Sequence, residues 1–494
     1  VPTGTTYSWS IPTVTGGITG GAAGTSQSTI FGTLTNPTNT VQTATYTATP
    51  ATASCTGATF TVTVTINPKP VIPNQTATIC SGASFTTTLT DATPTTATIV
   101  PSATTYTWAL PVVTGGITGG AAGTSQSTIF GTLTNPTNTV QTATYTVTPT
   151  SGATGACVGA TFTVIATVNP KPVIPNQIAA ICSGTAFTTT PVNASPTTAT
   201  IVPSGTTYTW TVALNANVTG ESDQATAQTS ITQTLTNTTN TVQTVVYTVT
   251  PTSGASGACP GATFTVTVTV NPKPTIANET TAVCSTNLFT VTPTTGGVNN
   301  NIIAAGTTYT WAAPVVTGGI TGGLLGTAQA SITGTLTNPT NTPQTATYTV
   351  TPTSGTCAGA TFTVVVTVNP KPVIPNQTAT ICSGLAFTTT PVNASPTVAT
   401  IVPASTTYTW TVVDNTSVTG DSNQATAQSS ISQTLTNITN TVQTVVYTVT
   451  PTSGAQGSCP GATFTVTVTV NPKPYVSAQT AVACSGSGFT VSPV

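Results

Sequence analysis

Ten cysteines are the residues of this 494-residue chain whose type and spacing could do chemistry. They recur at an early site, Ile/Val/Ala-Cys-Ser, and at a late site, Cys-X-Gly-Ala-Thr-Phe. The early cysteines are Cys80, Cys182, Cys284, Cys382 and Cys484, and the late ones are Cys55, Cys157, Cys259, Cys357 and Cys459. Because the chain has no histidine, periodic cysteine pairs indicate disulfide bonds and an oxidising, extracellular location.

Three pairings are open. The first pairing forms bonds within a repeat, which span 77, 77, 73 and 77 residues: Cys80–Cys157, Cys182–Cys259, Cys284–Cys357 and Cys382–Cys459. It leaves Cys55 and Cys484 to partners outside the segment. Bonds between the late cysteine of one repeat and the early cysteine of the next span 25 residues and use all ten. The third pairing joins an early cysteine to the next repeat's late one, such as Cys182 to Cys357. We favour the first, because closing a long loop stabilises a small domain by about 3 to 5 kcal/mol, although a β-sandwich would place the two sites near opposite ends.

The elements that carry these cysteines form a repeat of about 100 residues, the size of a whole domain. Each repeat ends in an apolar/threonine alternation, first at Phe60, Val62, Val64 and Ile66, which is the period of a half-buried strand. Proline cannot donate to a sheet ladder, so the Asn-Pro-Lys-Pro that follows should be a stiff connector. The connectors are 67–70, 169–172, 271–274, 369–372 and 471–474.

These connectors delimit complete repeats at 71–168, 173–270, 275–368 and 373–470. Residues 1–66 correspond to a repeat without its first strands, and 475–494 to the start of a further repeat. We therefore expect the sequence to be a segment of a longer chain.

Within 71–168 the pattern predicts β-strands and almost no helix. A first strand over 71–79, broken by Pro73, precedes one over Phe85 to Leu89 and a polar loop over 91–103. A third strand carries Tyr106, Trp108 and Leu110 on one face, a glycine-rich loop or bulged edge follows, and strands over 129–133, 142–148 and 161–168 complete the set. Six or seven antiparallel strands with one buried tryptophan predict an all-β tandem array of immunoglobulin-like sandwiches, forming an extended rod.

Charged residues are 2% of the chain, and all five basic residues are connector lysines, each followed by proline. One lysine per domain cannot make a nucleic-acid footprint. No apolar run approaches the roughly 18 to 20 residues needed to cross a bilayer. Without histidine, and with only six scattered acids, we expect no enzyme activity and no cofactor.

Two residue sets have both a functional and a structural interpretation. The loop acids Glu221, Asp223, Asp414 and Asp421 are weak calcium candidates, but two carboxylates per domain are few for a site that takes six to eight oxygens. The tryptophans could stack on sugars, but each shares a strand face with an inward tyrosine, so we expect core packing. They are Trp9, Trp108, Trp210, Trp311 and Trp410.

The loop after the tryptophan strand exists in two versions. It is glycine-rich in the first, second and fourth repeats, as at 115–123, whereas the third repeat has Val218 to Asp223 and the fifth a similar sequence. A loop that varies over a constant core is where a partner-binding surface would lie.

The Ile-Cys-Ser-Gly start, the Thr-Tyr-Thr-Trp strand, the Leu-Thr-Asn turn and the Cys-X-Gly-Ala-Thr-Phe ending together resemble the PKD-like and immunoglobulin-like repeats of large Bacteroidetes surface proteins, including gliding-motility adhesins of the SprB type. The resemblance covers the whole chain. It implies export across the outer membrane, by type IX secretion, and a cell-surface filament or stalk without catalytic residues.

We therefore expect a structural stalk or filament segment of a very large secreted adhesin, serving gliding motility or surface attachment. Its partners would be neighbouring repeats of the same chain, surface glycans or other copies of the filament. Two alternatives stay open: a glycan- or protein-binding array that uses the variable loops, and a self-assembling extracellular fibre in which 475–494 completes the first domain of another copy.

Overall fold

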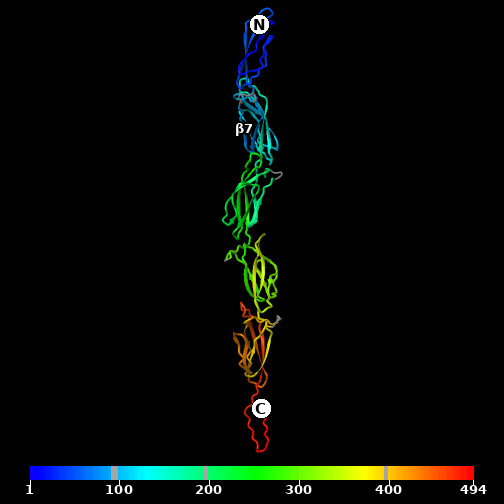
Figure 1. The fold of residues 1–494 in the computed structure, drawn as a ribbon, viewed down its shortest axis with the longest axis vertical. Helices are drawn as coiled ribbons and strands as arrows, with labels where there is room; N and C mark the ends of the chain where they lie inside the picture. Colours follow the sequence, from blue (N-terminus) through cyan, green and yellow to red (C-terminus); the bar gives the residue numbers. More distant parts are fainter. Residues whose placement is uncertain (91–97, 194–198, 298, 394–398, 494) are drawn as a thin grey trace. The chain divides into compact units, whose positions relative to one another are not determined.

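The computed structural model describes residues 1–90, 98–193, 199–297, 299–393 and 399–493 (Figure 1). Every regular element among these residues is a β-strand, which confirms the predicted all-β class. The predicted loop over 91–103 lies outside the described residues at 91–97. The chain divides into two compact units, one of residues 1–181, 185–235 and 244–269 and the other of 182–184, 236–243 and 270–494.

The second repeat, in the first unit, is a sandwich of two sheets. One sheet has the order β10-β8-β12-β13-β6, with β9 also on β12, and the other pairs β11 with β7. Its strands are β6 (Gln75–Cys80), β7 (Ser84–Thr87), β8 (Thr105–Trp108), β9 (Val112–Val113), β10 (Gly123–Gln126), β11 (Ile129–Thr132), β12 (Gln141–Thr150) and β13 (Phe162–Asn169).

The fourth repeat, in the second unit, repeats this arrangement. Its larger sheet has the order β22-β30-β28-β24-β26, with β25 and β29 on β28, and its smaller sheet pairs β23 with β27. The strands are β22 (Glu279–Cys284), β23 (Leu288–Val291), β24 (Thr308–Trp311), β25 (Val315–Val316), β26 (Gly326–Gln329), β27 (Ile332–Thr335), β28 (Gln344–Ser354), β29 (Cys357–Ala358) and β30 (Phe362–Asn369).

The third and fifth repeats are a variant of this arrangement. In them the short strand that follows the tryptophan strand, β17 or β34, joins the smaller sheet, which has the order β15-β19-β17 or β32-β36-β34. The larger sheets have the orders β14-β21-β20-β16-β18 and β31-β38-β37-β33-β35. Third-repeat strands are β14 (Gln177–Cys182), β15 (Thr185–Thr189), β16 (Thr207–Val212), β17 (Val218–Thr219), β18 (Gln224–Gln228), β19 (Ile231–Asn237), β20 (Gln243–Thr252) and β21 (Phe264–Asn271). Fifth-repeat strands are β31 (Gln377–Cys382), β32 (Leu385–Thr389), β33 (Thr407–Val412), β34 (Val418–Thr419), β35 (Gln424–Gln428), β36 (Ile431–Asn437), β37 (Gln443–Thr452) and β38 (Phe464–Asn471).

Alternation along the strands builds the core between the two sheets. Phe162, Val164, Ala166 and Val168 of β13 are 0 to 3% exposed, while most of the residues between them face outward. Tyr145 from β12 packs edge-on against a phenylalanine of β7, which joins the two sheets.

Three details of the predicted strands are wrong. The strand with Trp108 ends there, and Leu110 is 69% exposed. The strand β10 was not predicted, because its Gly-Thr-Ser-Gln sequence has no apolar alternation. The strands are also not all antiparallel, since β6 runs parallel to β13. Many residues separate these two strands along the chain, so no tight turn forces them to be antiparallel.

The first repeat consists of a single sheet, in the order β2-β4-β1-β3 with β5 on β4. Its strands are β1 (Thr6–Trp9), β2 (Thr13–Val14), β3 (Gly24–Gln27), β4 (Gln42–Ala51) and β5 (Phe60–Ile66). Among the described residues no strand lies on the outer edge of β5, where β13 of the second repeat carries β6. Phe60 at the start of β5 is consequently 39% exposed.

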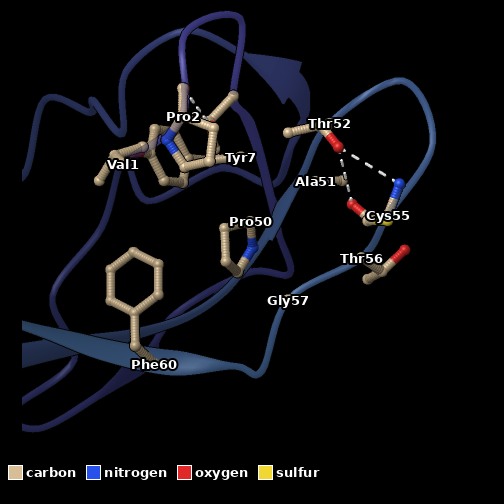
Figure 2. Close-up of a pocket in the computed structure, with 11 residues that line it drawn as sticks. Val1, Pro2, Tyr7, Pro50, Ala51, Thr52, Cys55, Thr56, Gly57 and Phe60 are labelled. Carbon is tan, nitrogen blue, oxygen red and sulfur yellow. Dashed lines mark hydrogen bonds between the residues drawn. The ribbon is translucent and has the colours of Figure 1, made fainter.

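Next to Phe60, the first repeat has a largely apolar pocket of about 770 Å³ (Figure 2). Tyr7, Pro50, Gly57 and Phe60 line it. Among the described residues, β5 pairs only with β4, whereas β13 pairs with β12 on one side and with β6 on the other.

Candidate functional site: disulfides between repeats

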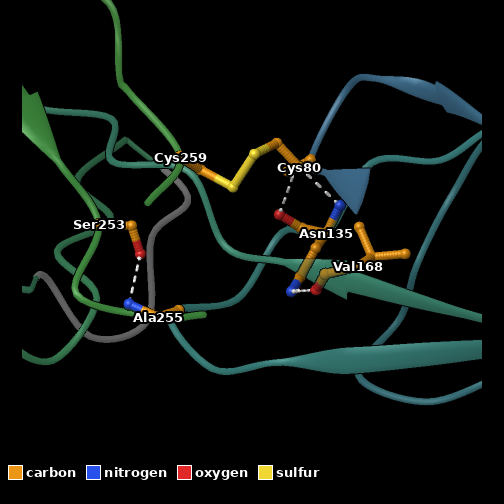
Figure 3. The surroundings of a disulfide bond; sticks show 7 residues. Cys80, Asn135, Val168, Ser253, Ala255 and Cys259 are labelled. Atoms are coloured by element: carbon orange, nitrogen blue, oxygen red, sulfur yellow. Dashed lines mark hydrogen bonds between the residues drawn. A yellow bond between two sulfur atoms is a disulfide. The ribbon is translucent and has the colours of Figure 1, made fainter. Parts of the chain in front are cut away.

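Each disulfide of the structure joins two different repeats. Cys80, the last residue of β6, is bonded to Cys259 in a loop of the third repeat, with 5.6 Å between the Cα atoms (Figure 3). Two further bonds, Cys182–Cys357 and Cys284–Cys459, follow the same rule, and each bond lies within one compact unit. The early cysteine of one repeat thus binds the late cysteine of the next.

The favoured bonds within repeats are therefore wrong for Cys80–Cys157 and its equivalents, and so are bonds that span 25 residues. The reason is the parallel pairing of the first and last strands. Cys80 stands opposite Asn169, at the end of β13, whereas Cys157 precedes the start of β13 at Phe162. The two sites of one repeat lie at opposite ends of its sandwich.

The third pairing is possible because the late loop of one repeat contacts the preceding connector. A Cβ on Gly257 would lie 3.0 Å from Nδ2 of the connector residue Asn169. Gly261, two residues after Cys259, lies against the carbonyl oxygen of Pro172 in the same connector. The connector and the late loop thus bring Cys259 beside Cys80.

Four cysteines are free: Cys55, Cys157, Cys382 and Cys484. The bonded late cysteines are 0 to 1% exposed, whereas Cys55 is exposed and Cys157 is half-buried.

In the second repeat, a buried asparagine fixes the end of the sandwich that carries the early cysteine Cys80. Nδ2 of Asn135 donates to the carbonyl oxygens of Thr139 and Val168, at 2.7 and 2.9 Å. Its Oδ1 accepts from the backbone and side chain of Thr137, and its backbone N–H donates to Ser81 Oγ at 2.9 Å. Asn135 is 2% exposed, so these bonds satisfy a buried amide.

This asparagine was not among the predicted site residues. The signal for it was present, since Leu-Thr-Asn recurs at a fixed place in every repeat. A turn sequence does not show, however, that the side chain reaches two strands. The equivalents of Asn135 are Asn36, Asn237, Asn338 and Asn437.

The four weak calcium candidates lie in loops. Glu221, Asp223 and Asp421 accept backbone hydrogen bonds there, and Asp414 is exposed. Glu221 accepts from the N–H of Asn215, and Asp421 from the N–H of Asn415 at 3.0 Å. Among the described residues no three acids or cysteines come close enough to share a metal ion. Burial, followed by the charge of Glu221, raises the pKa of Tyr247.

Asp223, the other loop acid of the third repeat, accepts the same hydrogen bond that the amide of Asn423 accepts in the fifth repeat. Asp223 Oδ1 accepts from Val212 N–H at 2.8 Å, and Asn423 Oδ1 accepts from Val412 N–H at the same distance. Because a neutral side chain replaces the carboxylate, this position needs an acceptor and not a charge. We infer a loop-capping role rather than calcium binding.

The tryptophans are packed inside the repeats and are 4 to 5% exposed. The indole N–H of Trp108 donates to the carbonyl oxygen of Ala121 at 3.0 Å, and Phe130 packs edge-on against the ring. These rings are not free to stack on sugars.

The glycine-rich loop is also shaped by packing. A Cβ on Gly123 would lie 2.4 Å from the ring of Trp108. Gly119 has a φ of 91°, and a Cβ on it would lie 2.4 Å from the Thr132 carbonyl oxygen. The glycines in this loop are therefore explained by close contacts, without a ligand.

A pocket of about 610 Å³ lies where the third repeat meets the fourth, within the second unit. Asn271, Pro272, Ala304 and Gly355 are among its lining residues. The loop before Cys357 is shorter than the loop before Cys259, which leaves the connector less covered there. Nothing charged lines the pocket.

Comparison with known proteins identifies the repeat. The sequence profile of the PKD-like domain matches residues 1–70, 76–172, 179–274, 278–372 and 379–474. No curated protein sequence matches the chain. Among the described residues, no helix is long and apolar enough to span a membrane.

Similar solved structures include an I-band fragment I67–I69 of titin, at 9% identity and a TM-score of 0.28, covering 61% of this chain and 97% of that one. The human desmocollin-1 ectodomain matches at 12% identity and a TM-score of 0.21, covering 97% and 94%. Immunoglobulin domains 1–4 of sidekick-1 match at 11% and 0.18, covering 82% and 97%. At these TM-scores the likenesses carry no argument about function.

Proposed function

Because this chain belongs to the PKD-like domain family, with five tandem copies of the domain, we propose that it is the structural stalk or filament segment of a large secreted cell-surface adhesin. The repeats form an extended rod that holds a binding region away from the cell. Gliding motility or surface attachment, and export across the outer membrane, are the settings that the sequence resemblance favours.

The observation that carries this proposal is that the disulfides join neighbouring repeats. Cys80–Cys259 spans the connector 169–172, so two covalent paths run from the second repeat to the third. A pull along the chain is then shared between the connector and the disulfide. A bond inside a single domain would stabilise that domain without restraining the angle to its neighbour.

The surface chemistry supports a passive structural role. Charged residues are 2% of the chain, so changes of salt have little to screen. The bonded late cysteines are buried, which protects these bonds from reducing agents outside the cell. A stalk exposed to a variable medium gains from both properties.

Small-angle X-ray scattering on the oxidised full chain tests the rod. Strands of about 8 to 10 residues at about 3.3 Å per residue give domains about 30 to 40 Å long. The tandem domains placed in line then give a maximum dimension of about 150 to 220 Å. In Cys80→Ser the joint between the second and third repeats loses its restraint, so the mean radius of gyration should fall. Cys157→Ser, which removes a free thiol, is the matched control and should leave the dilute chain unchanged.

A maximum dimension below about 100 Å would contradict the rod. Identical scattering from the wild type and Cys80→Ser would contradict the restraining role of the disulfide.

A further inference from the structure

We propose that the pocket where the third repeat meets the fourth is a binding site for a short uncharged oligosaccharide. The pocket lies in the interior of the array, and all of its lining residues belong to the second unit. This inference goes beyond the stalk function and does not depend on it. It rests on three differences between this joint and the equivalent joints of the same chain, and on the chemistry of the lining residues.

The connector asparagine is the first group that differs between the joints. Asn169 and Asn369, the last residues of β13 and β30, are 1% and 2% exposed. A glycine of the late loop covers each amide. A Cβ on Gly257 would lie 3.0 Å from Nδ2 of Asn169, and the distance from Gly457 to Nδ2 of Asn369 would be 2.8 Å. The equivalent Asn271, at the end of β21, is half-buried and lines the pocket.

The serine at the start of the late loop is the second difference. Ser253 of the third repeat is 3% exposed, and its Oγ accepts from the N–H of Ala255 at 3.2 Å. Ser354 has the same place in the fourth repeat, but it is half-buried and lines the pocket. A second polar group that is buried in a sister repeat thus lies at the open site.

The glycine after this serine is the third difference. A Cβ on Gly254 would lie 2.5 Å from backbone atoms of Gly205, and a Cβ on Gly454 would lie 2.3 Å from the carbonyl oxygen of Ser405. A Cβ on the equivalent Gly355 would meet no atom within 4 Å. The late loop of the fourth repeat therefore stands away from the loop that precedes the tryptophan strand.

A shorter late loop explains all three differences. The third repeat has four residues between Gly254 and Cys259, whereas the fourth has only Thr356 between Gly355 and Cys357. The residue equivalent to Gly257, which covers the connector asparagine, is therefore absent. Cys357 still forms its disulfide with Cys182, so the joint is bonded while the space beside the connector stays open.

The lining residues select an uncharged ligand that is rich in hydroxyl groups. The amide of Asn271 has donors and an acceptor, and the hydroxyl groups of Ser354 and Thr356 both donate and accept. A sugar hydroxyl also does both, so it can pair with each of them. Pro272 and Ala304 add an apolar wall for the C–H face of a sugar ring. The volume of about 610 Å³ lies in the range of about 300 to 1,000 Å³ that is typical of small-molecule sites.

Other classes of ligand fit this lining less well. Among the described residues no carboxylate and no lysine lines the pocket. A divalent cation would therefore lack anionic ligands, and an anion would lack a positive partner. A wholly apolar ligand would cover the amide of Asn271 without pairing it, which lowers affinity.

A printed array of neutral oligosaccharides of glucose, galactose, mannose and N-acetylglucosamine, with sialylated oligosaccharides as the charged comparison, tests the oxidised full chain. Calorimetric titration with the neutral oligosaccharide that binds best on the array then measures the Kd. We expect saturable binding of a neutral oligosaccharide.

The variant Thr356→Ala-Ser-Gly-Ala gives the fourth repeat the late loop of the third and should close the pocket. Its Kd should rise about ten-fold or more, because several hydrogen bonds are lost together. The third repeat folds with this loop, and a non-reducing peptide map that shows Cys182 bonded to the late cysteine verifies the fold. Asn271→Ala should raise the Kd about 2- to 12-fold, the range for one hydrogen bond. Asn169→Ala, at the covered equivalent position, is the matched control and should bind as the wild type does.

The same Kd for the wild type and the loop variant would overturn the inference. So would the absence of saturable binding to every neutral oligosaccharide, or binding to sialylated oligosaccharides alone. Association of the chain with itself that the loop variant abolishes would also overturn it, because the pocket would then hold a second copy. The scattering measurement on Cys80→Ser concerns a different joint, so the stalk function and this site are tested separately.

Discussion

Asn135 shows how one residue holds together the end of a sandwich that carries an early cysteine. Its buried amide satisfies carbonyl groups of the turn and of β13, next to the strand end that carries Cys80. A buried carbonyl that loses its donor costs about 1 to 3 kcal/mol. The position therefore affects the stability of the fold as well as the placement of the disulfide.

Asn135→Ala should destabilise the second repeat by about 2 to 4 kcal/mol, because two buried carbonyl groups and the Thr137 donors lose their partner. Urea unfolding followed by tryptophan fluorescence measures the change. Thr134→Ala, at the exposed neighbouring residue, is the control and should lie within about 0.5 kcal/mol of the wild type. A loss of equal size in both variants would refute the role given to Asn135.

The buried tyrosines determine how stability depends on pH. Burial raises the pKa of Tyr348 to about 12, against about 10 in an unfolded chain. Between these values the folded state holds a proton that the unfolded state has lost, so a rise in pH favours unfolding. Stability should be unaffected by this residue below about pH 10 and should fall from there to about pH 12.

Tyr348→Phe should make this alkaline decline shallower, while other buried tyrosines such as Tyr247 and Tyr447 keep part of it. At pH 8 the variant should be no less stable, because the Tyr348 hydroxyl is buried without a hydrogen-bond partner. Urea midpoints at pH 8 and pH 11 measure both effects. Superimposable pH profiles for the two proteins would show that Tyr348 does not titrate in this way.

At the scale of the strand, the alternation of apolar and polar residues predicted most elements. In β12 and β13, for example, buried and more exposed residues alternate along most of the strand. It missed β10, whose pairing to β8 is irregular and whose residues are mostly polar. It also could not show direction, because an alternating pattern is the same for parallel and antiparallel strands. The direction of β6 decides which end of the sandwich carries Cys80, and the loop-closure argument that favoured a bond within a repeat takes no account of that end.

The identical segments 24–36 and 123–135 show a second limit of sequence-based prediction. Both carry the same local preference, but only the second contains the strand at Ile129–Thr132, where β7 supplies a partner. β-propensity reflects packing against neighbouring strands more than an intrinsic backbone preference. The strand therefore depends on a segment that lies far away in the sequence.

At the scale of the whole chain, the repeat period and the PKD-like profile establish a tandem array. The spacing of the cysteines was compatible with three arrangements, and the choice depends on contacts between the late loop and the connector, such as Gly257 on Asn169. Sequence spacing alone does not report these contacts. The proposed stalk function is argued from how one repeat meets the next.

A disulfide map of the oxidised chain tests the central claim most directly. Every lysine precedes proline, so chymotrypsin rather than trypsin should generate the peptides, which are then separated without reduction and identified by mass spectrometry. We predict the cross-linked pairs Cys80–Cys259, Cys182–Cys357 and Cys284–Cys459. Finding Cys80 bonded to Cys157, or Cys157 bonded to Cys182, would contradict the claim that the disulfides bond the early cysteine of each repeat to the late cysteine of the next.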